Sequence, residues 1–518
     1  MSKLRWLAAL AIILSLSPAS AVKAQSQDPG KKESKAEQQA ETKKPKERTV
    51  VTEHTITING QQIPYKATAG TILLRDAKGH PTASMFYVAY TRSDATDMSA
   101  RPISFLYNGG PGSSTVWLHM GAYGPKMVAT ANAAPTGPAP YRIVDNPYSL
   151  LPVTDLVFID AVGTGYSHTV GKATGKDFYG VDEDVRSFGQ FIRRYVTKND
   201  RWNSPKFLIG ESYGTFRSAA LGNYLQQHYN MDLNGIVLMS NVLDLGTISF
   251  APGSDMPYIF YVPSYAAAAY YHKMLKNPPS DLVKFLAAAR QFASTDYAQA
   301  LIKGSALGAS EENAVAQRLS YFTGLSVNYL IKAKLRVNLP QFMVQLQRAK
   351  GLTTGRLDAR FTGPLYDLLS EYAQYDPQAT AISSAFTAAF DSYIREDLHY
   401  FSNRNYITES DQVNREWDWK HVGMRGYGFP GSPNVEGDLI HALISNTRLH
   451  VQVENGYYDL ATPFFATEYT MDHLGLPANI ERHIQLRYYH SGHMMYLRPQ
   501  SHKDLSGNVS QFIEKYSK

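Results

Sequence analysis

Short, almost continuous apolar runs alternate along this chain with longer stretches of helical periodicity, and this alternation limits the fold more than any other feature. The apolar runs are ISFLYN (103–108), DLVFID (155–160), KFLIGES (206–212), GIVLMSN (235–241) and RLHVQVENG (448–456). Helix-like stretches such as DVRSFGQFIRRYV and FRSAALGNYLQQHY lie between them. Strands that are buried on both faces of a parallel sheet read as continuous apolar runs, and helices connect them. The pattern predicts an α/β fold with a mostly parallel central sheet.

A β-rich region precedes this pattern, from Val50 to about Arg92. The segments HTITING and QQIPYKA meet at Asn59 and Gly60, a dipeptide that favours a tight hairpin turn. We therefore expect an antiparallel hairpin at the start of the folded chain.

A long helical segment interrupts the strand pattern between Asn241 and about Arg448. Stretches such as SDLVKFLAAARQFA and AISSAFTAAFDSYI have helical periodicity. At 518 residues the chain exceeds the usual size of one domain, so a second domain or a large insertion is expected. Because strand-like segments resume afterwards, we predict a helical cap at 246–444, inserted between two parts of one core at 49–245 and 445–518. An independent helical domain is the alternative.

The N-terminus has the features of an export signal. Lys3 and Arg5 precede the apolar run WLAALAIILSLS, and small residues in AVKAQ favour cleavage before Gln25. An uncleaved anchor is the alternative, but the apolar run is shorter than the roughly 20 residues that a membrane-spanning helix needs. We predict a signal peptide at 1–24, a solvated linker at 25–48, no membrane span after cleavage, and a periplasmic or secreted location.

Composition excludes several classes of function. The net charge of +6 is spread over a long chain without a basic helix, so nucleic acid is not an expected partner. The absence of cysteine excludes disulfides and thiol chemistry. The stretch GTGYSHTVGKAT departs from the phosphate-binding P-loop in spacing, and it has Ala173 where a Ser or Thr must hold magnesium. We expect no cofactor, and no feature of the sequence indicates an oligomeric state.

The sharpest chemical motif is GESYG, residues 210–214. It fits the pattern G-x-S-x-G, it follows the apolar run KFLI, and it precedes a helix-like stretch. A tight strand-to-helix turn of this kind exposes the serine hydroxyl as a nucleophile. We therefore predict Ser212 as the catalytic nucleophile.

A serine hydroxyl needs a base and a group that orients the base, and in this type of fold both follow the serine along the chain. Asp459 lies just beyond the apolar run at 448–456, and His493 lies in HSGHMMY beyond another strand-like stretch. His490 is the main rival for the base, and Gly492 favours His493 because it permits an exposed loop conformation. A metal site built from His483, His490 and His493 lacks any known ligand spacing, so we predict no metal.

The stretch YNGGPGSS, residues 107–114, supplies a glycine-rich loop at the end of an early strand. Acyl transfer creates an oxyanion that needs two backbone N–H donors, one from the residue after the nucleophile and one from such a loop. We assign these donors to Tyr213 and Gly110. A plain glycine turn is the alternative.

Together, the motifs NGGPGSS, GESYG, NGYYDLATP and SGHMMY resemble the serine carboxypeptidase family, peptidase family S10, of the bacterial exported type, across roughly residues 100–510. The resemblance implies an α/β-hydrolase fold with a helical insertion and the release of single residues from peptide C-termini. It implies Ser212 as nucleophile, His493 as general base in preference to His490, and Asp459 as the group that orients the base. It places Gly110 and Tyr213 in the oxyanion hole.

The resemblance also implies that Asn108 and Glu211 bind the terminal carboxylate of the substrate. Two carboxyl groups share a hydrogen bond only if one is protonated, so Glu211 should have a raised pKa. The sequence departs from the family pattern at two positions: Ser113 stands where a Cys is usual, and Ala122 stands where the family has a further acid. The second departure leaves the acid network around Glu211 incomplete.

The predicted function is a serine carboxypeptidase that acts on peptides with a free C-terminus through an acyl-enzyme. An esterase or acyltransferase with the same triad is the nearest alternative, although it would give Asn108 and Glu211 no carboxylate to bind. A non-catalytic binding protein on a hydrolase fold is the alternative from a different class.

Overall fold

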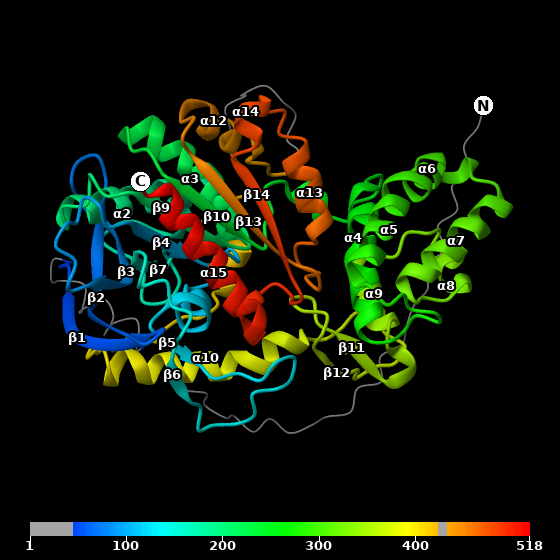
Figure 1. Cartoon of the computed structure of the whole chain (residues 1–518), viewed down its shortest axis with the longest axis horizontal. Coiled ribbons are helices and arrows are strands. Elements are labelled where there is room, and N and C mark those ends of the chain that lie inside the picture. The colour runs from blue at the N-terminus through cyan, green and yellow to red at the C-terminus, as the bar shows by residue number, and fades with distance from the viewer. Residues whose placement is uncertain (1–44, 423–431) are drawn as a thin grey trace, which may run out of the picture. The chain divides into compact units, whose positions relative to one another are not determined.

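The computed structural model describes residues 45–422 and 432–518. Its main sheet has the strand order β1-β2-β3-β7-β4-β9-β10-β13-β14, and β8 pairs with β3 (Figure 1). The strands of this sheet are β1 (Thr49–Ile58), β2 (Gln61–Arg75), β3 (Pro81–Arg92), β4 (Ile103–Tyr107), β7 (Asp155–Ile159), β8 (His168–Thr169), β9 (Lys206–Glu211), β10 (Gly235–Met239), β13 (His450–Gly456) and β14 (Ile484–Tyr489). The predicted signal peptide at 1–24 and most of the predicted linker lie outside the described residues.

The apolar runs form the parallel part of this sheet. Strands β7, β4, β9, β10, β13 and β14 pair in parallel, whereas β1, β2 and β3 add an antiparallel edge. The hairpin between β1 and β2 turns at Asn59 and Gly60, whose φ angles of 50° and 78° are the left-handed values that such a turn requires. Both the mostly parallel sheet and the hairpin are as predicted.

Helices cover both faces of the parallel strands because successive side chains point in opposite directions. In β4, Phe105 and Tyr107 pack in one apolar cluster with residues of α2 and α3, while Leu106 packs in the other with residues of α10 and α15. Figure 1 shows α15 in front of the sheet and α3 behind it. The covering helices are α2 (Val181–Lys198), α3 (Tyr213–Tyr229), α10 (Pro377–Glu396), α12 (Glu436–Ser445), α13 (Phe464–Asp472), α14 (Ala478–Glu481) and α15 (Pro499–Tyr516).

The segment between β10 and β13 is largely helical. Its first part packs in a third apolar cluster, to which Phe260, Phe292 and Phe342 contribute together with Tyr457 and Phe464 from beyond β13. Its first part contains α4 (Met256–Tyr271), α5 (Leu282–Phe292), α6 (Ala298–Lys303), α7 (Ala309–Thr323), α8 (Val327–Lys332) and α9 (Leu339–Gln345), and α11 (Asp411–Glu416) follows α10. The segment also contains a short antiparallel pair, β11 (Leu352–Thr354) and β12 (Thr362–Pro364), which the helical periodicity did not indicate. A second short pair, β5 (Lys126–Val128) and β6 (Ile143–Asp145), follows the glycine-rich loop.

The last residues of the predicted linker contact the core. Glu47 accepts hydrogen bonds from Arg194 at 2.9 Å and from Lys198 at 3.1 Å, and the N–H of Arg48 donates to the Thr71 hydroxyl at 3.0 Å. None of the helices in the described parts of the chain combines the length and the apolar character needed to cross a membrane.

Candidate active site

Ser212 lies at the sharp turn between β9 and α3. Its φ of 61° and ψ of −131° are unusual for a residue with a side chain. Glycines on both sides permit this turn, because a Cβ on Gly210 would lie 2.2 Å from the carbonyl oxygen of Gly214. The N–H of Ser212 donates to the carbonyl of Met239 at 2.9 Å, which ties the turn to β10. This is the backbone geometry of a nucleophile elbow.

His493 and Asp459 lie beside one another on loops that follow β14 and β13. The Nδ1 atom of His493 is 2.8 Å from Oδ2 of Asp459. The Asp459 carboxylate also accepts hydrogen bonds from the N–H groups of Ala461 and Thr462, at 2.7 and 2.9 Å, and from the Thr462 hydroxyl at 2.8 Å. These bonds fix the carboxylate, and with Nδ1–H donated to it, Nε2 is the ring atom left to accept a proton.

The backbone of His493 is held on both sides. Its N–H donates to the carbonyl of Leu357 at 2.7 Å, and its carbonyl accepts a hydrogen bond from the Ser240 hydroxyl at 2.6 Å. Burial disfavours the imidazolium, but the neighbouring Asp459 carboxylate outweighs it and raises the pKa of His493 above its ordinary value. The charges of His493 and Asp459 also act on the pKa of Glu211, which places this pair beside the elbow.

The glycine-rich loop after β4 packs directly against the start of α3. A Cβ on Gly109 would lie 2.4 Å from the backbone nitrogen of Tyr213 and 2.7 Å from that of Gly214. Gly110 has a φ of 103°, which a residue with a side chain rarely adopts. The loop thus lies next to the Tyr213 amide, as a two-donor oxyanion hole requires.

Asn108 and Glu211 form a buried hydrogen-bonded pair at the ends of β4 and β9. The Asn108 amide donates to Oε1 of Glu211 at 3.0 Å, and the Tyr496 hydroxyl donates to the same oxygen at 3.4 Å. Oδ1 of Asn108 accepts from the N–H of Leu118 at 3.0 Å, which fixes the orientation of the amide. Oε2 of Glu211 is buried and has no hydrogen-bond partner among the described residues.

The Glu211 carboxyl holds its proton more tightly than an ordinary glutamate. Burial raises the pKa of Glu211 to about 7, although the positive charge of His493 and the hydrogen bonds from Tyr496 and Asn108 oppose the rise. A carboxyl that is partly protonated near neutral pH, with one oxygen unpaired, can share a hydrogen bond with a second carboxylate.

A buried ion pair that no sequence motif indicated holds the backbone of Asn108 in place. Nε of Arg217, in α3, lies 2.6 Å from Oδ2 of Asp184, in α2. The same guanidinium donates to the carbonyl of Asn108 at 2.8 Å. No sequence pattern indicated this pair, because each residue is a single charged position in its own helical stretch.

A second support comes from Glu409, almost three hundred residues after the glycine-rich loop. Its Oε1 accepts hydrogen bonds from the Ser113 hydroxyl at 2.8 Å and from the indole N–H of Trp117 at 3.1 Å. The carbonyl of Gly112 accepts from the N–H of Ser410 at 2.8 Å. The serine that replaces the usual cysteine at 113 is therefore tied to the segment after α10 by hydrogen bonds.

The remaining predicted positions lie in distinct surroundings. Ala122 is buried in a π-helical turn, Leu118–Tyr123, and its carbonyl accepts hydrogen bonds from Asn146 at 2.9 Å and His502 at 2.7 Å. His490 is exposed and packs edge-on against Tyr457. His483 stacks on His450, whereas His493 pairs with Asp459.

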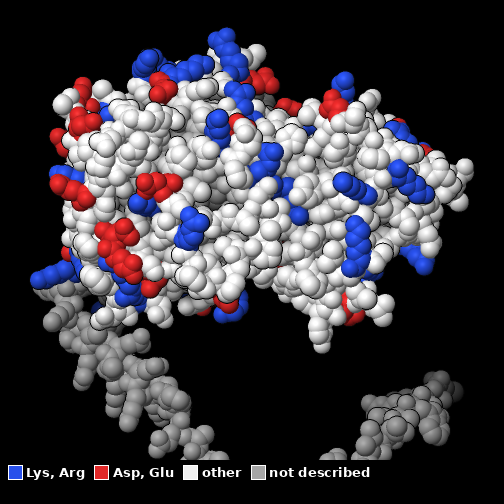
Figure 2. All heavy atoms as spheres, turned by 60° about the horizontal axis from the view of Figure 1, so that its bottom comes forward, with Lys and Arg blue, Asp and Glu red and all other residues white. Residues whose placement is uncertain are grey.

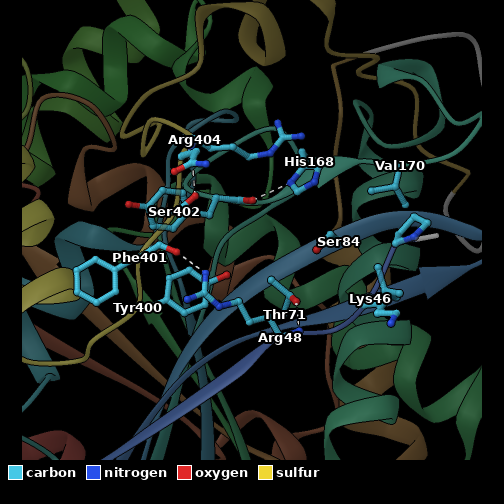
Figure 3. Close-up of a pocket in the computed structure, with 14 residues that line it drawn as sticks. Lys46, Arg48, Thr71, Ser84, His168, Val170, Tyr400, Phe401, Ser402 and Arg404 are labelled. Carbon is cyan, nitrogen blue, oxygen red and sulfur yellow. Dashed lines mark hydrogen bonds between the residues drawn. The ribbon is translucent and has the colours of Figure 1, made fainter. Parts of the chain in front are cut away.

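A cavity of about 420 Å³ lies at the antiparallel edge of the sheet, away from these residues. Its lining includes Lys46, Arg48, His168 and Arg404 (Figure 3), and it contains none of the seven predicted site residues. This cavity is therefore separate from the candidate active site. Elsewhere on the surface, basic and acidic side chains are interspersed on the face that Figure 2 presents.

The family comparison covers most of the chain. A model of the serine carboxypeptidases matches residues 59–512. No curated protein sequence matches the chain.

Among solved structures, the chain resembles Kex1, a prohormone-processing carboxypeptidase from Saccharomyces cerevisiae. The two share 17% identity with a TM-score of 0.54, over 88% of this chain and 91% of the other. A proline iminopeptidase from Mycobacterium smegmatis is 12% identical with a TM-score of 0.36, over 90% of this chain and 99% of the other. The likeness to Kex1, together with the sheet order, confirms the predicted α/β-hydrolase fold.

Proposed function

This chain belongs to the serine carboxypeptidase family, and from that premise we propose that it removes residues from the free C-termini of peptides with a Ser212–His493–Asp459 triad and an acyl-enzyme intermediate. The family match over residues 59–512 confirms the resemblance predicted from four motifs, and with it an enzyme of the serine carboxypeptidase type. The individual residue roles are our proposal.

Acylation begins at the elbow. Nε2 of His493 accepts the proton of the Ser212 hydroxyl as the oxygen attacks the last peptide carbonyl of the substrate. The amides of Gly110 and Tyr213 donate to the oxyanion that forms. The C–N bond then breaks as His493 returns the proton to the leaving amine, and the rest of the peptide stays esterified to Ser212. The Asp459 carboxylate, held by Ala461 and Thr462, stabilises the transient imidazolium.

Deacylation repeats these steps with water as the nucleophile. His493 takes a proton from the water, the hydroxide attacks the ester, and the proton returns to the Ser212 oxygen as the ester bond breaks. The shortened peptide leaves with a new free carboxylate.

The observation that carries the exopeptidase assignment is the buried pair Asn108–Glu211. The substrate of an esterase or an endopeptidase places no terminal carboxylate beside the buried carboxyl, whose free oxygen and neighbouring amide donor would then stay unpaired. A substrate carboxylate supplies the missing partner, because it accepts from the Asn108 amide and from a protonated Glu211.

We also propose export, with a periplasmic or extracellular location. Lys3, Arg5 and the apolar run that follows support a signal peptide. Amino-terminal sequencing of the protein recovered from its native host tests cleavage before Gln25.

The function is tested with one peptide made with a free and with an amidated C-terminus, followed by mass spectrometry. We expect single-residue ladders from the free peptide and much slower cleavage of the amide. Equal cleavage of both would contradict the proposal that Asn108 and Glu211 bind the terminal carboxylate. Cutting at internal bonds would overturn the exopeptidase assignment. Hydrolysis of simple esters without any peptide ladder would favour the esterase.

The nucleophile is tested separately with a fluorophosphonate probe. We expect labelling of the wild-type chain and no labelling or turnover after Ser212→Ala. An unlabelled, correctly folded wild-type chain would favour a non-catalytic binding protein.

A further inference from the structure

Arg356 lies on a segment that passes between the two triad loops. Its carbonyl accepts a hydrogen bond from the N–H of Leu460, next to Asp459, at 3.0 Å. The carbonyl of the following residue, Leu357, accepts the N–H of His493. On the other side, the N–H of Arg356 donates to the carboxylate of Asp376 at 2.5 Å. The backbone beneath the Arg356 side chain is therefore fixed on both sides, directly beside the proposed base.

The guanidinium of Arg356 differs from that of its neighbour Arg360. Arg360 is buried and donates to Asp358, Asn132 and Ser491. Arg356 is exposed, and no residue in the described parts of the chain forms an ion pair or a hydrogen bond with its guanidinium within the usual distances. Among the described residues, this leaves a cation without a partner at the edge of the triad.

The charge of Arg356 acts on groups around the site. Desolvation raises the pKa of Glu409, and the positive charge of Arg356 opposes that rise. The pKa of His493 reflects burial and the Asp459 carboxylate, and Arg356 acts on it as well, in the lowering direction. The guanidinium of Arg356 thus lies near enough to His493 and Glu409 for its charge to act on both, and it acts on Tyr261 in α4 as well.

The neighbours of Glu409 indicate on which side of the scissile bond Arg356 lies. The Glu409 carboxylate accepts hydrogen bonds from Ser113 and Trp117. Leu118, the residue after Trp117, donates its N–H to Oδ1 of Asn108. Asn108 is the proposed ligand of the terminal carboxylate, so Glu409 flanks the residue that is held there. His493, the other group that feels Arg356, must give its proton to the amine of that same residue. Arg356 is an exposed cation near both of these groups, and its backbone is fixed beside the loops of Asp459 and His493.

We propose that Arg356 binds the side-chain carboxylate of an aspartate or glutamate at the C-terminal position of the substrate, so that the enzyme prefers acidic C-terminal residues. The inference rests on the proposed carboxypeptidase function and names the substrate class of that site. A guanidinium forms paired hydrogen bonds with a carboxylate, and its charge persists at all working pH values.

Glu409 opposes this preference when it is ionised. The residue as a whole is exposed, but its carboxylate is enclosed by Ser113 and Trp117. Burial and the negative charge of Asp411 raise the pKa of Glu409, and this leaves a larger neutral fraction in mildly acidic solution. The positive charge of Arg356 is then less compensated. The preference for acidic residues is accordingly stronger in mildly acidic than in alkaline solution.

The experiment compares two peptides that differ only in a C-terminal Glu or Gln, using the full chain. We expect kcat/KM to favour Glu about five- to tenfold, a value between those of an exposed ion pair and a charge-assisted hydrogen bond. Arg356→Gln should bring the ratio to near unity by raising KM for the Glu peptide, with little change for the Gln peptide. Arg356→Lys should retain part of the preference. Glu409→Gln should increase it, and Arg482→Gln, an exposed arginine before β14, should leave it unchanged.

Each outcome decides the inference. An unchanged Glu/Gln ratio in Arg356→Gln overturns it, as does a wild-type enzyme that cleaves both peptides equally. A preference that follows the penultimate residue in a second peptide pair overturns the assignment to the leaving residue. Cleavage of neither peptide by an enzyme whose Ser212 is labelled overturns the proposed function itself, and the inference with it.

Discussion

At the scale of single residues, the proposed role of Glu211 predicts that substrate binding depends on pH. The proposed clamp needs a protonated Glu211, whose pKa is about 7. Affinity for a free C-terminus should therefore fall about tenfold for each pH unit above this value, because the deprotonated carboxylate repels the substrate. In Glu211→Gln the amide keeps a donor at every pH, so this fall should be absent.

Binding is separated from chemistry by measuring it in a Ser212→Ala background. Calorimetric titration of one peptide between pH 5.5 and 8.5 gives the dissociation constant for each chain. The amidated peptide is the control, and its affinity should not vary through the same transition. A flat profile in the parent chain, or the same slope after Glu211→Gln, would show that Glu211 does not meet the carboxylate.

At the scale of elements, the contact between the glycine-rich loop and α3 holds the two segments of the proposed oxyanion hole together. In Gly109→Ala the new Cβ meets the Tyr213 and Gly214 nitrogens at 2.4 and 2.7 Å, so the loop and the helix must separate. Loss of one aligned donor should lower kcat on the order of 10²- to 10³-fold. The measurement is kcat on a free peptide, with circular dichroism to verify folding.

Gly437→Ala is the matched control for this substitution. Gly437 lies in α12, and a Cβ there has nothing within 4 Å. We expect unchanged kcat and a free energy of unfolding about 0.5–1 kcal/mol higher, because alanine favours helix. Equal activity of the two variants would show that the loop does not depend on its contact with α3.

The ion pair between α2 and α3 supports the same region. Arg217→Met leaves Asp184 buried without its partner, which should lower the free energy of unfolding by about 3–5 kcal/mol. Urea unfolding measures this loss, and adding Asp184→Asn should recover part of it. If the double variant is no more stable than the single one, the loss comes from the bond to Asn108 rather than from the uncompensated charge.

The elements were predictable where the local sequence determines them. Strands β4, β7, β9, β10 and β13 are buried on both faces, so they appear as apolar runs, and Asn59–Gly60 determines its hairpin turn. The buried Arg217–Asp184 pair and the bond from Glu409 to Ser113 join segments far apart in the chain, and no local pattern encodes such contacts. The pair β11–β12 is too short to interrupt the helical periodicity around it.

In the candidate site, too, residues within a local motif were predictable from the sequence and residues outside a motif were not. The residues in motifs, such as Ser212 and His493, were identified from spacing, and the structure brings them to one edge of the sheet. Arg356 has no motif. Its position is visible only from two backbone hydrogen bonds, one from Leu460 to the Arg356 carbonyl and one from His493 to the carbonyl of the next residue, Leu357.

At the scale of the whole molecule, stability should depend on buried carboxyl groups. Burial raises the pKa of Glu454 in β13 from an ordinary 4.5 to about 7, so the folded state binds its proton more tightly than the unfolded state. The contribution of Glu454 is therefore largest below about pH 4.5 and declines as the pH rises to 7. The decline amounts to about 3 kcal/mol.

The test is the difference in unfolding free energy between the wild type and Glu454→Gln. The difference is needed because buried histidines such as His119, whose pKa burial lowers to about 3, change stability in the opposite direction. The wild type should lose stability relative to the variant between pH 4.5 and 7, and the exposed Glu514→Gln should track the wild type. A constant difference across this range would mean that Glu454 stays ionised when the protein folds.

The long segment between β10 and β13 also sets the order in which the enzyme can be made. Ser212 leaves the ribosome with its elbow, but Asp459 and His493 follow more than two hundred residues later. They lie on the loops after β13 and β14, of which β13 pairs with β10 and with β14. A growing or interrupted chain therefore has a serine without its base. The proposed hydrolytic activity therefore requires synthesis to pass His493, and β13 and β14 to join the sheet.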